Sequence, residues 1–297
     1  MNKIPPCVLT FSALDSSSGA GLTADALTLF KLQVHPFSII TANTIQNSAN
    51  VLQVNEISAD TVYYQAATIL DEFADNIKAI KIGVIYTIEN VEVIVKILQK
   101  YNNIPVIFDP VLISGNGNNL VKNQTEFINY LTQNLLPLCF LITPNYNELF
   151  ALANLPSNQN NQNNQNNQNN QNNKNNIEKS INKLFSYNVK NILLTGTDFF
   201  ISNNNNKNQT HIKHQLFIDN FKNNFDFLVE KINASFHGSG CTLSSAIAAE
   251  VAKQVPLKNA VSNALNFTEL CLKNAFRNNK ISDYNQQNFQ FIPNRNI

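Results

Sequence analysis

The amino-acid sequence predicts an α/β protein whose central, mostly parallel sheet is flanked by helices. Short apolar runs rich in β-branched residues recur along the chain, and stretches with helical periodicity separate them. The 297 residues suffice to bury one large core, so we expect a single domain over residues 1–297. The expected strands are residues 8–13, 37–42, 79–85, 106–110, 140–143 and 191–194.

Two of the intervening stretches place apolar residues along one side of a helix. In the first, which opens near residue 21, the apolar stripe consists of Leu22, Ala26, Leu29 and Phe30. In the second, the stripe consists of Ile177, Ile181, Leu184 and Phe185. We expect both stripes to lie on the sheet.

A low-complexity segment interrupts this pattern at residues 157–176. It is almost wholly Asn and Gln in a three-residue pattern, with no apolar residue to bury. We therefore expect a disordered surface loop inserted in the domain. An aggregation-prone or scaffolding tract is the alternative, but a period of three is far too short for a solenoid repeat.

Charge and cysteine content narrow the choice of partners. The formal net charge is +1, so no basic excess points to nucleic acid or to an anionic membrane, and a small-molecule substrate fits better. The cysteines Cys7, Cys139, Cys241 and Cys271 show neither metal-ligand spacing nor a disulfide framework. No apolar run is long enough to span a bilayer, and the N-terminus lacks a signal-peptide pattern. We expect a cytoplasmic protein with reduced thiols.

The most informative motif is His237-Gly-Ser-Gly-Cys241, where a loop of small residues opens a helix rich in Ala and Ser. A helix N-terminus offers unpaired backbone N–H groups and a partial positive charge, and glycines let an anionic oxygen approach them. Such a loop can stabilise a transferring phosphoryl group, and Cys241 stands where a base could take the proton of the attacking hydroxyl. A tight turn followed by a buried packing cysteine explains the same residues.

A second glycine-rich element, residues 15–25, follows the first expected strand. It lacks the Lys of a Walker loop and the spacing of a dinucleotide fingerprint, yet open α/β sheets bind ligands at such strand ends. Asp25 is either a hydrogen-bond acceptor for a substrate or a favourable charge in the first turn of a helix. The amides and hydroxyls of residues 41–47, which close the second strand, either bind a heteroaromatic edge or form a turn.

Oxygen-bearing side chains close the fourth and fifth expected strands, at Asp109 and in residues 143–148. Oxygen ligands from several strand ends suit a hydrated Mg²⁺ on nucleotide phosphates. Turn chemistry explains Asp-Pro and Thr-Pro-Asn about as well. Taken together, these elements would supply substrate contacts, oxygen ligands for a metal ion and an anion-binding loop, in that order along the chain.

In this set of motifs the chain resembles the hydroxymethylpyrimidine/phosphomethylpyrimidine kinases of thiamine biosynthesis and salvage, a branch of the ribokinase superfamily. The shared motifs are residues 16–25 (SSSGAGLTAD), 40–47 (ITANTIQN), 81–83 (KIG), 109–111 (DPV), 141–145 (LITPN) with Glu148, and 237–244 (HGSGCTLS). The resemblance implies a three-layer, ribokinase-like fold and a homodimer. It also implies that ATP and Mg²⁺ serve to phosphorylate 4-amino-5-hydroxymethyl-2-methylpyrimidine and then its monophosphate.

The resemblance further assigns roles to individual residues. The residues that it places against the pyrimidine are Asp25, Gln46 and Val84. Those of the phosphoryl-transfer loop are Gly238, Ser239, Gly240 and, in the place of the Asp base of the sugar-kinase relatives, Cys241. Those beside Mg²⁺ are Asp109 and Glu148, and those beside ATP are Asn145 and Thr195. Because a helix N-terminus stabilises a thiolate, we expect the cysteine to be partly deprotonated at neutral pH.

Three places depart from the family pattern. Thr195 opens Thr-Gly-Thr-Asp where the family has Lys-Gly-Gly-His, Ser235-Phe236 replaces Asn-Thr, and Val84 replaces Met. Loss of the Lys affects the second phosphorylation most, because that step handles more anionic charge. The alternatives are a pyridoxal or pyridoxine kinase, whose substrate also carries a hydroxymethyl group, and a ligand-binding homologue without activity.

Overall fold

The computed structural model describes residues 4–112, 120–121, 123–155, 167–196, 211–277 and 290–297. Within them, a nine-stranded sheet has the order β3-β2-β1-β4-β5-β6-β7-β8-β9. The strands that run parallel to one another are β1 (Cys7–Asp15), β2 (His35–Gln46), β4 (Ile77–Ile82), β5 (Val106–Phe108), β6 (Leu141–Ile142) and β7 (Asn191–Leu194). The prediction of a mostly parallel sheet is confirmed.

Three further strands, which the sequence did not predict, pair antiparallel at the two ends of the sheet. They are β3 (Val51–Glu56), β8 (His211–Ile218) and β9 (Asn223–Glu230). From Asn224 onward, exposed residues alternate with half-buried ones along β9, and polar side chains interrupt all three strands. A half-buried strand at a sheet edge needs no continuous apolar run, so these segments lack the pattern by which the buried strands were found.

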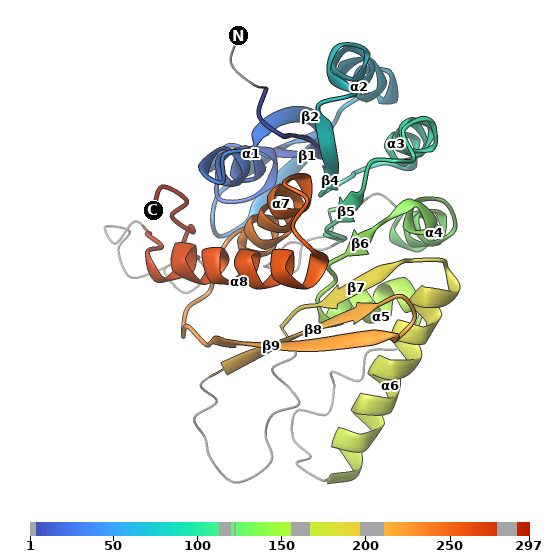
Figure 1. Cartoon of the computed structure of the whole chain (residues 1–297), viewed down its shortest axis with the longest axis vertical. Coiled ribbons are helices and arrows are strands. Elements are labelled where there is room, and N and C mark those ends of the chain that lie inside the picture. The colour runs from blue at the N-terminus through green and yellow to red at the C-terminus, as the bar shows by residue number, and fades with distance from the viewer. Residues whose placement is uncertain (1–3, 113–119, 122, 156–166, 197–210, 278–289) are drawn as a thin grey trace.

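Helices cover both faces of the sheet, as Figure 1 shows. One face carries α1 (Gly21–Lys31), α7 (Ser239–Ala252) and α8 (Leu257–Lys273). The other carries α2 (Ala59–Phe73), α3 (Ile88–Lys100), α4 (Gln124–Tyr130), the short turns Leu131–Leu135 and Leu136–Leu138, α5 (Tyr146–Ala153) and α6 (Asn167–Ser186). The three-layer arrangement is therefore as expected. None of the helices in the described part of the chain is long and apolar enough to cross a bilayer.

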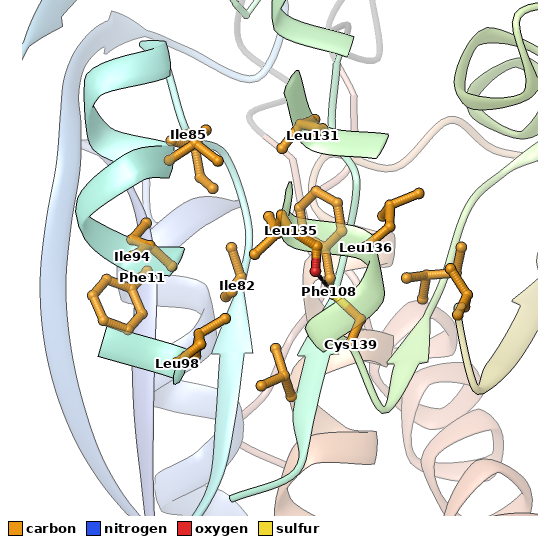
Figure 2. Packing of buried hydrophobic residues seen from close by; sticks show 14 of the residues in the cluster. Phe11, Ile82, Ile85, Ile94, Leu98, Phe108, Leu131, Leu135, Leu136 and Cys139 are labelled. Carbon is orange, nitrogen blue, oxygen red and sulfur yellow. Dashed lines mark hydrogen bonds between the residues drawn. The ribbon is translucent and has the colours of Figure 1, made fainter. Parts of the chain in front are cut away.

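Alternation along β1 divides the apolar side chains between the two layers, because successive residues of a strand point to opposite faces. Leu9 and Phe11 belong to the core under α2 to α6, and Val8 belongs to the core under α1, α7 and α8. Figure 2 shows the first of these cores, where Ile82 of β4 lies near Ile94 of α3. Burial of each such side chain contributes roughly 1.5–3 kcal/mol, so both layers fix the strands whose ends build the site.

One of the two predicted helical stripes is confirmed and the other is partly wrong. In α6, Ile181 and Leu184 are fully buried. In α1, Phe30 is 76 % exposed, whereas Asp25 and Thr28 are fully buried. Asp25 and Thr28 are on the buried side of α1 because the helix packs against α7 as well as against the sheet.

The expectation of a disordered loop at residues 157–176 is wrong over its second half. Helix α6 begins at Asn167, so residues 167–176 are its first turns, and residues 157–166 lie outside the described residues. Asn and Gln cost no more than about 0.7 kcal/mol each relative to Ala in a helix. The buried turns from Ile177 onward give the helix a stable part that polar residues can extend.

Candidate active site

The carboxyl ends of the parallel strands open on one cavity of about 650 Å³. Open α/β sheets bind their ligands at this edge. The segments that follow β1, β4, β5, β6 and β7 form part of its wall, together with the N-terminus of α7. The residues assigned to a site from the sequence that line this cavity are Gln46, Val84, Asp109, Asn145, Glu148, Thr195, Gly238, Ser239, Gly240 and Cys241.

The loop that opens α7 packs tightly on the loop that follows β1. Gly238, the N-cap of α7, has φ 87°, and a Cβ on it would lie 1.9 Å from the carbonyl oxygen of Gly19. A Cβ on Gly19 would lie 2.4 Å from Cδ2 of His237. Only glycines allow this approach, since any side chain would push the two loops apart.

Asp15 joins the same two loops through its side chain. Its carboxylate accepts hydrogen bonds from the N–H and hydroxyl of Ser17, both 2.8 Å, and from the N–H of Ala20, 2.9 Å. It also lies 2.8 Å from Nε2 of His237. Burial alone would raise the pKa of Asp15, but the hydrogen bonds with His237, Ala20 and Ser17 outweigh it and lower the pKa. No role was predicted for Asp15, although its place at a strand end before a glycine turn was a usable signal.

Asp109 faces the first turn of α7 from the end of β5. A Cβ on Gly240 would lie 3.8 Å from its Oδ2 atom, the hydroxyl of Ser244 donates to Oδ2 at 3.1 Å, and that of Thr143 donates to Oδ1 at 3.4 Å. Burial raises the pKa of Asp109, and the opposing charge of Lys81 does not cancel this effect. The carboxyl group is therefore held beside Gly240 in the first turn of α7.

Glu148 is the second buried carboxylate of the cavity, and it also closes the first turn of α5. Its Oε2 accepts from the N–H of Asn145 at 2.9 Å, and its own N–H donates to Oδ1 of Asn145 at 3.0 Å. Burial, followed by the charge of Asp109, raises the pKa of Glu148 well above its ordinary value. The described residues hold no group of three or more His, Cys, Asp or Glu side chains arranged to hold a metal ion. A metal at this place would therefore take two protein carboxylates and further oxygens from a ligand.

A family model described as phosphomethylpyrimidine kinase matches residues 15–285, which include both glycine loops and both carboxylates. The chain belongs to the phosphomethylpyrimidine kinase family. It is 30 % identical over 261 residues, 88 % of each chain, to the hydroxymethylpyrimidine/phosphomethylpyrimidine kinase of Haemophilus influenzae. It is 31 % identical over 274 residues, 91 % of each chain, to that of Rhizobium meliloti.

Solved structures agree with this membership. A Bacillus subtilis pyridoxal kinase in complex with ADP has a TM-score of 0.75 at 26 % identity, covering 93 % of this chain and 94 % of that one. A phosphomethylpyrimidine kinase from Clostridium difficile has a TM-score of 0.67 at 25 % identity, covering 89 % and 97 %. The expected ribokinase-like fold is confirmed.

In this phosphomethylpyrimidine kinase family member, Asp25 is fully buried and is not among the residues that line the cavity, and its contact with the pyrimidine stays a prediction. Its carboxylate oxygens lie 2.9 and 2.8 Å from Nζ of Lys81, and the hydroxyl of Ser245 donates to it at 2.7 Å. Burial alone would lower the pKa of Lys81, but Asp25, Cys241 and Asp109 outweigh it and raise the pKa. Asp25 therefore neutralises a buried cation beneath the site.

Cys241 lies on the cavity wall as expected, but the expectation of a partly ionised thiol is wrong. Burial raises the pKa of Cys241 to about 12. The charge of Lys81 and a hydrogen bond from the N–H of Gly21 oppose this rise, while Asp109 and Asp25 add to it. The helix N-terminus does not compensate for the removal of the thiolate from water.

One end of the cavity joins an apolar surface to an amide. Val84 belongs to a small apolar cluster with Ala13 and Leu120. Gln46 is half-buried and donates from Nε2 to the hydroxyl of Thr44 at 2.7 Å. Its carbonyl oxygen is an acceptor, so this end offers a flat apolar face beside an acceptor for an amino group.

The opposite end lies between β8, β9 and α8, and sequence analysis missed it because neither strand was predicted. The apolar residues that line it are Ile212, Val229, Leu265 and Leu272. His214 lies there, 9 % exposed, with no hydrogen-bond partner for Nδ1 among the described residues, and burial lowers the pKa of His214 to about 4. Asn145 and Thr195 form a parallel bridge on the cavity wall. Thr197 and Asp198, which complete the departing motif, lie outside the described residues.

Proposed function

We propose that the protein transfers the γ-phosphoryl group of ATP to the hydroxymethyl oxygen of 4-amino-5-hydroxymethyl-2-methylpyrimidine. The observation that carries this proposal is the position of the loop Gly238–Gly240 in a cavity with two chemically different ends. One end offers an apolar face and an amide, and the other offers an apolar cleft under α8. A pyrimidine in the first and a nucleotide in the second would meet where the N-terminus of α7 stabilises the transferred charge.

The proposed pyrimidine contacts follow from the ring's own chemistry. A flat heteroaromatic ring packs on the apolar side chain of Val84, and its 4-amino group donates to the carbonyl oxygen of Gln46. The names of the relatives in Haemophilus influenzae and Rhizobium meliloti support this substrate.

The nucleotide would occupy the apolar cleft, with its phosphates directed past Asn145 and Thr195 toward the loop. The ADP complex of the Bacillus subtilis pyridoxal kinase supports nucleotide binding by this fold. Asp109 and Glu148 would hold Mg²⁺, since two adjacent buried carboxylates with raised pKa values suit a cation that shares its other positions with phosphate oxygens. When bound, Mg²⁺ supplies charge neutralisation to the phosphates.

In the proposed reaction, the substrate hydroxyl oxygen forms a bond to the γ-phosphorus. The bond from that phosphorus to the β–γ bridging oxygen breaks, and ADP leaves with the electron pair. The hydroxyl proton passes to the Cys241 thiolate. In a loose phosphoryl-transfer transition state the proton leaves late, so a base that is ionised in only a fraction of molecules can serve.

The monophosphate of the same pyrimidine is the proposed second acceptor, because relatives named hydroxymethylpyrimidine/phosphomethylpyrimidine kinase carry both substrates in their names. Thr195 offers no positive charge where the family has a Lys. We therefore propose that this second transfer is the slower of the two.

Pyridoxal is the second candidate substrate, because the TM-score to the pyridoxal kinase, 0.75, exceeds that to the phosphomethylpyrimidine kinase, 0.67. Coupled ADP-release assays with the hydroxymethylpyrimidine, its monophosphate and pyridoxal separate the candidates. We expect the largest kcat/KM for the hydroxymethylpyrimidine and a loss of that preference in Gln46→Ala. A larger kcat/KM for pyridoxal would reassign the substrate.

A homodimer in the cytoplasm is proposed as the working form. The edge strand β3 and the adjoining end of β2 expose Leu52 at 71 % and Ile45 at 49 %, and a second copy would cover them. The four cysteines are unpaired and buried, which supports a reducing compartment. Sedimentation velocity of the full chain, compared with Leu52→Asp, tests the dimer.

A further inference from the structure

The last residues of the chain return to the loop that opens α7. The N–H of Phe291 donates to the carbonyl of Ser235 at 2.8 Å, and the N–H of His237 donates to the carbonyl of Phe291 at 2.9 Å. The next residue, Ile292, pairs with Phe276 by two backbone hydrogen bonds. The N–H of Phe276 donates to the carbonyl of Ile292 at 3.1 Å, and the N–H of Ile292 donates to the carbonyl of Phe276 at 2.8 Å. We call residues 290–297 the C-terminal strap. It connects the end of α8 to the segment that leads into the glycine loop.

Arg295 of the strap is buried, with 5 % of its surface exposed, and its guanidinium reaches both glycine loops. On the loop after β1 it donates to the carbonyls of Ser18 at 3.2 Å and Gly19 at 2.7 Å. At the start of α7 it donates to the carbonyl of the N-cap residue Gly238 at 3.4 Å and to the hydroxyl of Thr242, in the first turn of the helix, at 2.8 and 3.1 Å. One side chain therefore fixes the relative position of two loops that are more than 200 residues apart in the chain.

The partners of Arg295 are neutral, which distinguishes it from the other buried cation. Lys81 is paired with the carboxylate of Asp25. No carboxylate in the described part of the chain forms an ion pair with Arg295, and an arginine remains protonated in proteins. Its positive charge is therefore not neutralised by a direct ion pair, and the acidic groups that it acts on at longer range include Cys241, Asp25 and Asp15 around the two loops. The same family model that matches residues 15–285 ends before Arg295.

We propose that Arg295 is a positioning residue for phosphoryl transfer: its guanidinium holds the loop Gly238–Gly240 against the loop after β1 and adds positive charge behind the anion-binding amides. This inference rests on the proposed function of the loop. The guanidinium acts through the carbonyls and the Thr242 hydroxyl, and it makes no contact with the reacting atoms. Fixed donors and charges cost no reorganisation when the transition state forms, so loss of Arg295 should lower kcat more than substrate affinity.

The test compares Arg295→Ala and Arg295→Lys with Arg277→Gln, which removes the other arginine of the chain, an exposed residue that lies over the ring of Phe291. For Arg295→Ala we expect kcat to fall about 100-fold, as for loss of one anion-hole donor, with the KM for the pyrimidine within about twofold. Added guanidinium chloride at low concentration should restore part of the kcat of Arg295→Ala alone. Arg295→Lys should be intermediate, and Arg277→Gln should keep the wild-type kcat.

A folded Arg295→Ala with the wild-type kcat would overturn the proposal, as would a loss of kcat that guanidinium leaves unchanged. If Arg295→Ala does not fold, the Arg295→Lys variant provides the test. A wild-type kcat and an unchanged Tm in Arg295→Lys would contradict the proposal that the guanidinium positions the loop. If the wild type phosphorylates none of the three acceptors, the proposed function fails. Calorimetric affinity for the ATP analogue AMP-PCP then tests Arg295 separately, with an expected weakening of about tenfold in Arg295→Ala; an unchanged Kd overturns the inference.

Discussion

The ionisable side chains around the glycine loop fall into two groups: those whose charges neutralise each other beneath the cavity, and those that face the cavity. Lys81 and Asp25 neutralise each other beneath the cavity, and removal of either partner alone would leave an uncompensated buried charge at a cost of about 3–5 kcal/mol. Asp109 and Glu148 face the cavity with raised pKa values, so a cation would lower the cost of keeping both ionised. In the proposed reaction, the residue whose charge state decides the chemistry is Cys241.

The pH dependence of kcat tests that role. Because burial raises the pKa of Cys241 to about 12, the fraction of thiolate grows about tenfold per pH unit over the neutral and mildly alkaline range. With saturating ATP and pyrimidine, we expect kcat of the wild type to rise between about pH 7 and pH 9.5. Cys241→Asp should remove the rise, because a carboxylate is more easily ionised than this thiol.

Cys241→Ser is the matched control for size and hydrogen bonding, since its hydroxyl does not ionise in this range. It should lack the rise and lose kcat together with Cys241→Ala, by about 10²- to 10⁴-fold. If Cys241→Ala keeps the full kcat and the wild-type pH profile, this cysteine is not the base.

Among the elements, the contact between the loop after β1 and the start of α7 is the most sensitive to change. Gly238 combines φ 87° with a carbonyl oxygen 1.9 Å from the position of a Cβ. Gly196, after β7, has φ 66° but no atom within 4 Å of such a Cβ. Alanine at Gly196 would therefore add only the strain of a side chain at positive φ. Alanine at Gly238 would add that strain and the free-energy cost of moving the two loops apart.

Urea unfolding of two alanine variants measures that difference. Gly196→Ala should cost about 1–2 kcal/mol, the strain of a side chain at positive φ. Gly238→Ala should cost more than Gly196→Ala, because the Gly19 carbonyl must also move. Equal losses of stability would show that the loops are not in the contact described.

The buried parallel strands could be predicted because each is rich in apolar, often β-branched residues, as in β4 (IKAIKI) and β7 (NILL). The strands β8 (HIKHQLFI) and β9 (NNFDFLVE) could not, since polar residues interrupt their apolar runs and their pairing joins them to the sheet only in the folded chain. The same limit applies at the site. The place of Cys241 followed from a local motif, whereas its ionisation depends on Lys81 and Asp109, which distant strands bring beside it.

At the scale of the whole molecule, segments from the two ends of the chain complete one site. The loop after β1 supplies one side of the glycine contact, the start of α7 supplies the other, and the C-terminal strap joins them through Arg295. The parallel strands between them place Asp109 and Glu148 on the same cavity. The fold therefore gathers the glycine loop that we propose binds the transferred phosphoryl group, two carboxyl groups and two apolar ends at a single edge of the sheet.

The most direct test of this account is phosphorus-31 NMR of the full chain incubated with Mg²⁺, ATP and 4-amino-5-hydroxymethyl-2-methylpyrimidine. We predict a new phosphomonoester signal, coupled to the hydroxymethyl protons, that grows in equal amount with ADP. Binding of ATP and of the pyrimidine without this signal would contradict the central claim that the loop Gly238–Gly240 transfers a phosphoryl group to the hydroxymethyl oxygen.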